Sequence, residues 1–247
     1  GGVTLQGEER ERVRAVMQEL AAQQAKFEQN IMDATDAFEH RETDRAALAG
    51  LPEFVIERAR ALAVERGVAG WCLRLDPPTY TTVLTHAESR ALREKYYEAW
   101  VTRASDQGPH ARKFDNGPLL ERIMALRHET AQLVGFKRFA EFSLATKIAE
   151  SARRVIGFLH DLAKRSRGAA LADLKTLEDF AGRKLASWDV AFYSERLKQQ
   201  KLKLAEEELR PYFPLPRVLD GLFKLCGTLF DLRVAEAPRP DTWHDTV

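Results

Sequence analysis

The sequence predicts an all-α protein, a multi-helix array with long antiparallel helices and at most one or two short strands. Apolar residues recur at spacings of three and four through most of the 247 residues, which is the period of an amphipathic helix. Glycine and proline separate these periodic stretches. Only one short stretch alternates apolar and polar side chains in the manner of a strand.

The first periodic stretch, residues 7–40, predicts one long helix. Its inward positions alternate four and three residues apart, as in a coiled-coil seam, and they are Val13, Met17, Leu20, Gln24, Phe27, Ile31, Ala34 and Phe38. A helix of this length needs a partner, so we expect a second long helix to pack against it. If the seam is buried, Phe27→Ala costs roughly 3–5 kcal/mol of folding free energy.

A second helix begins after Pro52, which is tolerated in a first turn, and stops near Gly67. Residues 71–75 alternate in polarity and predict one short strand before a run containing two prolines. The remaining periodic stretches predict helices over 79–86, 87–105, 119–134, 139–148, 151–186, 188–200, 206–209 and 214–230.

The composition is that of an ordinary soluble protein. Hydrophobic residues make up 45% and charged residues 30%, and the net charge is +1. This balance gives no excess of positive charge that would indicate binding to nucleic acid or to an anionic membrane. No apolar run approaches the roughly 20 residues of a membrane span. We therefore expect a cytoplasmic protein. Cys72 and Cys226 both have apolar neighbours, which favours two reduced thiols in the core.

Residues 128–132, His-Glu-Thr-Ala-Gln, are one residue away from the zinc-protease pattern H-E-x-x-H. Gln132 stands where the second histidine would be and is a poor zinc ligand, so we expect no metal on this helix. A metal enzyme built around His128 and Glu129 is a separate hypothesis that metal analysis can test. The pairs His160-Asp161 and His244-Asp245 consist of helix neighbours that point about 100° apart, which favours solvated or capping roles.

The densest mixture of aromatic and acidic groups lies at residues 188–195. One interpretation is a core anchor in which Asp189 caps the start of a helix by accepting backbone N–H bonds. The alternative is a wall of a peptide-binding cleft formed by Trp188, Asp189 and Tyr193. The sequence alone leaves both interpretations open.

Several longer stretches together resemble one enzyme family. They are NIMDAT (30–35), ALR and TRASD (91–93 and 102–106), ALRHE and LVGF (125–129 and 133–136), SLATK (143–147), residues 188–195, RPYFP (210–214) and Trp243-His244. In this order they resemble the zinc metallopeptidase family of thimet oligopeptidase, neurolysin and oligopeptidase A, with the bacterial oligopeptidase A branch nearest.

The resemblance implies a neurolysin-like, two-lobed helical peptidase with zinc on the floor of a deep channel. The family's zinc helix carries H-E-x-x-H, which is absent here, so we expect neither catalytic nor metal-binding residues in this chain. Residues 1–86 would be the later part of the N-terminal helical domain. Residues 87–247 would be the N-terminal helical portion of the catalytic domain, ending before the zinc site.

The chain would then be a scaffold and channel-wall segment of a zinc metallo-oligopeptidase that hydrolyses short peptides, and it would be inactive alone. Zinc would belong to the full-length protein, with none bound to this chain. Short peptides and the missing C-terminal half would be its partners, and the segment would be prone to self-association. The alternative is a free-standing helical module that binds peptides or proteins without catalysis.

Overall fold

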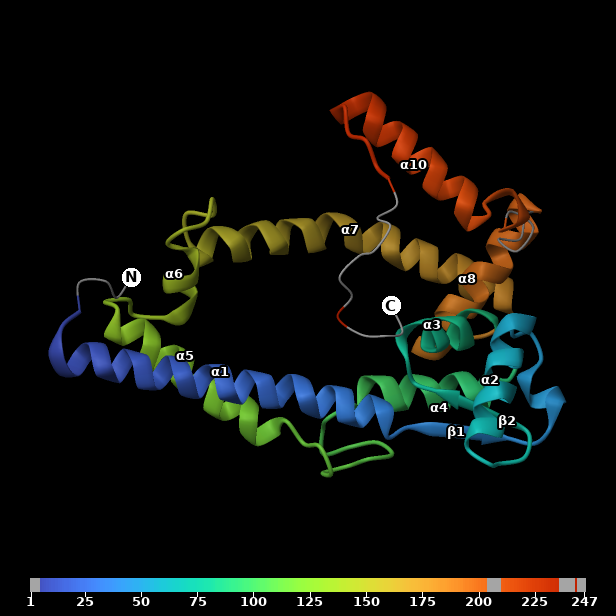
Figure 1. The fold of residues 1–247 in the computed structure, drawn as a ribbon, viewed down its shortest axis with the longest axis horizontal. Helices are drawn as coiled ribbons and strands as arrows, with labels where there is room; N and C mark the ends of the chain where they lie inside the picture. Colours follow the sequence, from blue (N-terminus) through green and yellow to red (C-terminus); the bar gives the residue numbers. More distant parts are fainter. Residues whose placement is uncertain (1–4, 204–209, 236–242, 244–247) are drawn as a thin grey trace. The chain divides into compact units, whose positions relative to one another are not determined.

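The computed structural model describes residues 5–203, 210–235 and 243, and it is mostly helical, as expected (Figure 1). The chain divides into two compact units, Gly1–Leu197 and Lys198–Val247. The elements in chain order are α1 (Gly7–Asp36), β1 (Glu39–Glu42), the 3-10 helix η1 (Arg45–Leu48), α2 (Glu53–Glu65), β2 (Trp71–Arg74), α3 (Pro77–His86), α4 (Arg90–Val101), α5 (Gly117–Leu133), α6 (Phe139–Leu144), α7 (Ala152–Ala181), α8 (Ser187–Leu202), the 3-10 helix η2 (Arg210–Tyr212) and α10 (Leu215–Phe230).

In the first unit α1 packs lengthwise against α5, and two ion pairs show that the helices are antiparallel (Figure 1). Arg12 Nε donates to Glu129 Oε1 at 2.6 Å, and Arg122 Nε donates to Glu19 Oε1 at 2.6 Å. The earlier residue of α1 pairs with the later residue of α5, so the two helices run in opposite directions. The expected pairing of long antiparallel helices is confirmed.

A buried pair of amides joins α1 to the residue before α5. Asn30 Nδ2 donates to Asn116 Oδ1 at 2.8 Å, and Asn116 Nδ2 donates to the carbonyl oxygen of Phe27 at 3.0 Å. Both side chains are buried, so each amide satisfies a group that would otherwise lose its hydrogen bond to water.

The buried stripe of α1 differs from the expected seam. Ala34 is buried as expected, but Met17 is 56% exposed and Val16, at 2%, takes the inward position. A strict seven-residue seam drifts around an α-helix of 3.6 residues per turn, so one stripe does not stay inward over 30 residues without supercoiling. Phe27 is only partly buried.

The expected helix over 7–40 is wrong at its end, because α1 stops at Asp36 and β1 follows. Phe38 and His40 are buried two residues apart, which is the period of a strand. The strand expected at 71–75 is confirmed as β2, and it pairs antiparallel with β1, with His40 opposite Leu73. β1 supplies hydrogen-bond partners for the backbone N–H and C=O groups of β2, which a single strand would lack.

The hydrophobic core lies around this small sheet, η1 and helices α2 to α4. It is dominated by branched aliphatic and alanine side chains, and it includes Tyr96, which has no exposed surface. Its members are Phe38, Leu48, Leu51, Val55, Ile56, Ala59, Leu73, Leu75, Val83, Leu84, Ala87, Leu92, Tyr96 and Ala99.

Other helix ends are set by capping residues. The helix expected over 87–105 begins at Arg90, because the Ser89 hydroxyl accepts the Leu92 N–H at 3.3 Å. The helix expected over 151–186 ends at Ala181, because Gly182 takes a left-handed conformation with φ +65°. The helix expected over 139–148 is also shorter and ends at Leu144. The short helix expected over 206–209 lies outside the described residues.

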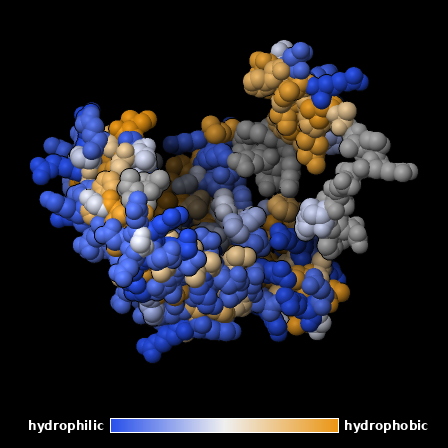
Figure 2. Space-filling view, turned by 60° about the vertical axis from the view of Figure 1, so that its left-hand side comes forward, coloured by the Kyte–Doolittle hydropathy of each residue, from blue (hydrophilic) through white to orange (hydrophobic). Residues whose placement is uncertain are grey.

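Two helices carry apolar residues that the described chain leaves exposed. In α7 they are Ile156, Phe158, Leu159, Leu162, Leu171, Leu174 and Phe180. In α10 they are Leu215, Val218, Leu219, Leu222, Phe223, Leu225, Leu229 and Phe230, and Figure 2 shows hydrophobic residues gathered on this helix. Cys226, also on α10, is partly exposed, so the expectation that both thiols lie in the core is wrong for Cys226 and right for Cys72. Among the described residues, no helix is both long and apolar enough to cross a bilayer.

Candidate functional site

The candidate site sits at the first turn of α8, where Asp189 is the third helical residue. Its Oδ2 accepts the backbone N–H of Ala186, the residue before the helix, at 3.1 Å. A carboxylate in a first turn also interacts favourably with the helix dipole. The interpretation of Asp189 as a capping residue is confirmed.

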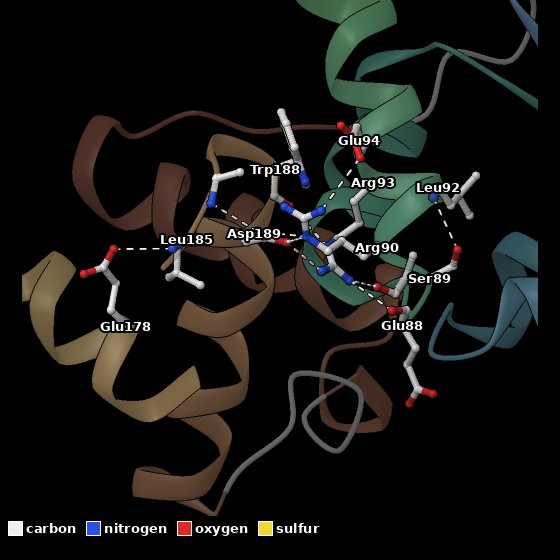
Figure 3. Close-up of polar contacts among 12 residues, drawn as sticks. Glu88, Ser89, Arg90, Leu92, Arg93, Glu94, Glu178, Leu185, Trp188 and Asp189 are labelled. Atoms are coloured by element: carbon white, nitrogen blue, oxygen red, sulfur yellow. Dashed lines mark hydrogen bonds and ion pairs between the residues drawn. The ribbon is translucent and has the colours of Figure 1, made fainter. Parts of the chain in front are cut away.

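Two arginines one turn apart on α4 converge on the same carboxylate (Figure 3). Arg90 Nε lies 3.2 Å from both Asp189 oxygens, and Arg93 Nη2 donates to Oδ1 at 3.0 Å. Asp189 is 0% exposed and Arg93 2%. This cluster of Arg90, Arg93 and Asp189, here called the arginine clamp, joins α8 to α4 across about a hundred residues of sequence.

The other two nitrogens of Arg93 are also hydrogen-bonded. Its Nη1 donates to the carbonyl oxygens of Ala87 at 2.7 Å and Glu88 at 3.2 Å, and its Nε donates to the carbonyl oxygen of Trp188 at 3.2 Å. A buried guanidinium is tolerated only when its donors are satisfied, and here carbonyl oxygens and one carboxylate satisfy them.

The clamp holds Asp189 in its charged form. Burial by itself raises the pKa of Asp189, but the hydrogen bonds from Arg93, the Ala186 N–H and Arg90 outweigh it and bring the pKa below its ordinary value. Both carboxylate oxygens are fully engaged by donors. Asp189 is therefore an anchor with no free lone pair directed to solvent, and it is unsuited to act as a general base.

Aromatic rings surround the clamp. The guanidinium of Arg90 lies over the Trp188 ring, 5.2 Å from its centroid, and those of Arg93 and Arg196 lie 4.2 and 5.0 Å from the centroid of the Phe192 ring. These distances are within the range of cation–π attraction. Trp188 Nε1 is buried and meets no acceptor among the described residues.

The three residues that the sequence singled out lie together but differ in accessibility. Trp188 and Tyr193 are partly exposed, whereas Asp189 has no exposed surface. Tyr193 packs edge-on against Phe192, with ring centroids 5.3 Å apart. Sequence reasoning missed Arg90 and Arg93, although two arginines one helical turn apart were a usable signal for an acidic partner.

The stretch around His128 does not fit a zinc site. His128 and Gln132 are exposed on α5, and the carboxylate of Glu129 is engaged by Arg12 of α1. Asp161 pairs with Arg165 one turn away at 2.8 Å, which is a surface contact. His244 and Asp245 lie outside the described residues. Within the described part of the chain, no three His, Cys, Asp or Glu side chains gather as metal ligands would.

Comparison with known proteins places these features in a family. The sequence profile described as Peptidase family M3 matches residues 83–247. Oligopeptidase A of Haemophilus influenzae is 41% identical over 251 residues, covering all of this chain and 37% of that protein. The probable cytosolic oligopeptidase A of Arabidopsis thaliana is 38% identical, covering 96% of this chain and 35% of that protein.

Dipeptidyl carboxypeptidase of Escherichia coli is 27% identical over the whole chain and 37% of its own length. The chain thus spans a little over a third of the curated relatives that it matches. The profile match covers about two thirds of the residues and shows that the chain belongs to peptidase family M3.

Proposed function

We propose that this chain is the helical scaffold and part of the channel wall of a zinc metallo-oligopeptidase that hydrolyses short peptides. The observation that carries the proposal is the alignment of the whole chain, at 41% identity, with little more than a third of an oligopeptidase A. Peptide hydrolysis is thus proposed for the whole protein, with short peptides as its substrates, and a cytoplasmic setting is proposed with it.

The wall would be formed by the rings of Trp188 and Tyr193, which are partly exposed and attached to a fixed support. Asp189 would hold the start of α8 in place and would not contact the peptide, because its carboxylate is buried and bound to Arg90 and Arg93. Rings held in this way lose little conformational entropy when a peptide binds.

We propose that the chain alone is inactive. The sequence contains no H-E-x-x-H, and the one histidine followed by glutamate lies in an exposed patch whose glutamate is already paired. Zinc, which as a Lewis acid activates water in this class of peptidase, would be held by residues outside this chain.

The exposed apolar faces of α7 and α10 support a further part of the proposal, that other segments of the same protein cover them. Each large apolar side chain left in water forgoes roughly 1.5–3 kcal/mol of burial. The chain alone is therefore expected to self-associate. We also propose a division near residue 86, between a later N-terminal domain and the start of the catalytic domain, which the profile match beginning at residue 83 supports.

An assay with a quenched fluorescent peptide and added zinc tests the inactivity. No turnover above buffer is expected from the purified chain, and His128→Ala should behave identically. Turnover that a chelator abolishes would refute the proposal. If His128→Ala also abolished it, the activity would be assigned to the near-motif on α5.

The gene tests whether the chain is part of a longer peptidase. An open reading frame that continues past Val247 into a helix carrying H-E-x-x-H is expected. A stop codon directly after Val247 would instead favour a free-standing binding module.

A further inference from the structure

A groove of about 300 Å³ lies between α2, β2 and the first turns of α3. The residues that line it include four with aliphatic side chains, Val55, Ala59, Leu62 and Leu73, which are here called its apolar floor. This volume is at the lower end of the range for small-molecule sites in proteins. The floor suits one aliphatic side chain.

Arg74 lines the groove from β2 and is not paired with an acidic side chain in the described part of the chain. Its neighbour across the strand pair is Glu39, but that carboxylate is already engaged. Cys72 Sγ donates to it at 2.8 Å, Arg41 Nη2 contacts it at 2.8 Å and Arg66 Nε at 3.8 Å. The guanidinium of Arg74 is therefore available to an external anion.

Arg58 lines the same groove from α2, and its side chain is 65% exposed. Among the described residues, its acidic contact is Asp76 Oδ2 at 3.4 Å, which is long for a charged hydrogen bond. The Asp76 carboxylate is also shared with the N–H of Thr79 at 3.0 Å and with the Thr79 hydroxyl. Most of the donor capacity of Arg58 thus stays open.

We propose that this groove binds a small apolar carboxylate, of the kind found at the C-terminal residue of a peptide. Its aliphatic side chain rests on the floor, and its carboxylate meets the planar guanidinium groups of Arg74 and Arg58, whose geometry suits carboxylates. Asp76 and Glu65 also line the groove, and their negative charge selects a single carboxylate over a phosphate or a polyanion.

The test is an NMR titration of the whole chain with N-acetyl-leucine, and with N-acetyl-leucinamide as the uncharged control. The acid is expected to shift resonances of groove residues and to bind about tenfold or more tightly than the amide, because charged hydrogen bonds are lost with the amide. Equal affinity for acid and amide, or no shifts with the acid, would overturn the proposal. N-acetyl-glycine binding as well as N-acetyl-leucine would overturn the role of the apolar floor.

Three variants test whether binding depends on the arginines of the groove or only on the net charge of the chain. Arg74→Gln and Arg58→Gln are each expected to weaken binding of N-acetyl-leucine about tenfold. Arg60→Gln is the matched control, because it makes the same charge change on α2 at an exposed position that does not line the groove. Circular dichroism checks that each variant is folded. Because Arg58 is exposed, its variant tests the proposal even if Arg74→Gln does not fold. If Arg60→Gln weakened binding as much as Arg58→Gln, binding would be non-specific and the proposal wrong.

Discussion

Removal of the Asp189 carboxylate tests whether the arginine clamp stabilises the fold. Asp189→Ala leaves Arg93, a guanidinium only 2% exposed, without its anionic partner and also removes the acceptor for the Ala186 N–H. Breaking a buried ion pair in this way costs about 3–5 kcal/mol. Because Arg93 keeps its hydrogen bonds to carbonyl oxygens, we expect the lower half of that range.

The measurement is urea unfolding of the purified chain followed by circular dichroism. Asp161→Ala is the matched control, since it removes an exposed ion pair with Arg165 on α7 and is expected to cost at most about 0.5 kcal/mol. A loss below about 1 kcal/mol for Asp189→Ala would refute the reasoning, because it would mean that the guanidinium groups do not need the carboxylate.

The pH dependence has a definite sign. The pKa of Asp189 is below its ordinary value of 3.8, so the folded chain binds fewer protons there than the unfolded chain does. The clamp's contribution is complete above 3.8 and is lost as the pH falls through the lower pKa of the folded state. Asp189→Ala should therefore flatten the acid limb of the stability profile, and an unchanged limb would contradict this.

Three further predictions concern other groups. Burial first, and then the neighbouring Lys95, lower the pKa of His40 below its ordinary value of 6.5. The contribution of neutral His40 to the free energy of unfolding is therefore complete above pH 6.5 and is lost as the pH falls through the lower pKa of the folded state. His40→Gln should remove this pH dependence from urea unfolding. Cys72 is buried, which raises its pKa to about 11, so a thiol reagent at neutral pH should label Cys226 alone in the native chain; rapid labelling of both would contradict the burial. Phe27→Ala should cost about 2 kcal/mol in urea unfolding, less than a fully buried ring, and a loss near zero would show that α1 and α5 do not depend on it.

The helices were predictable because their cause is local. Pro52 and Gly67 bracket α2, and the apolar period of residues 215–230 marks α10 without any knowledge of its neighbours. The missed element, β1, has a non-local cause. A strand of four residues is stable only beside its partner, and β2 lies about thirty residues further along the chain.

The candidate site shows the same division. The capping role of Asp189 depends on residues next to it in sequence and was predictable. Its pairing with Arg90 and Arg93 depends on the packing of α8 against α4, which no local sequence pattern predicts.

By itself the amino-acid sequence determined the helical class, the order of most elements and the stretches that place the chain in its peptidase family, because each depends on residue types at short spacings. Only the tertiary structure decided which charges are buried together and which side chains line one groove. Burial and ion pairing are properties of contacts between distant segments, and those contacts exist only once the chain has folded.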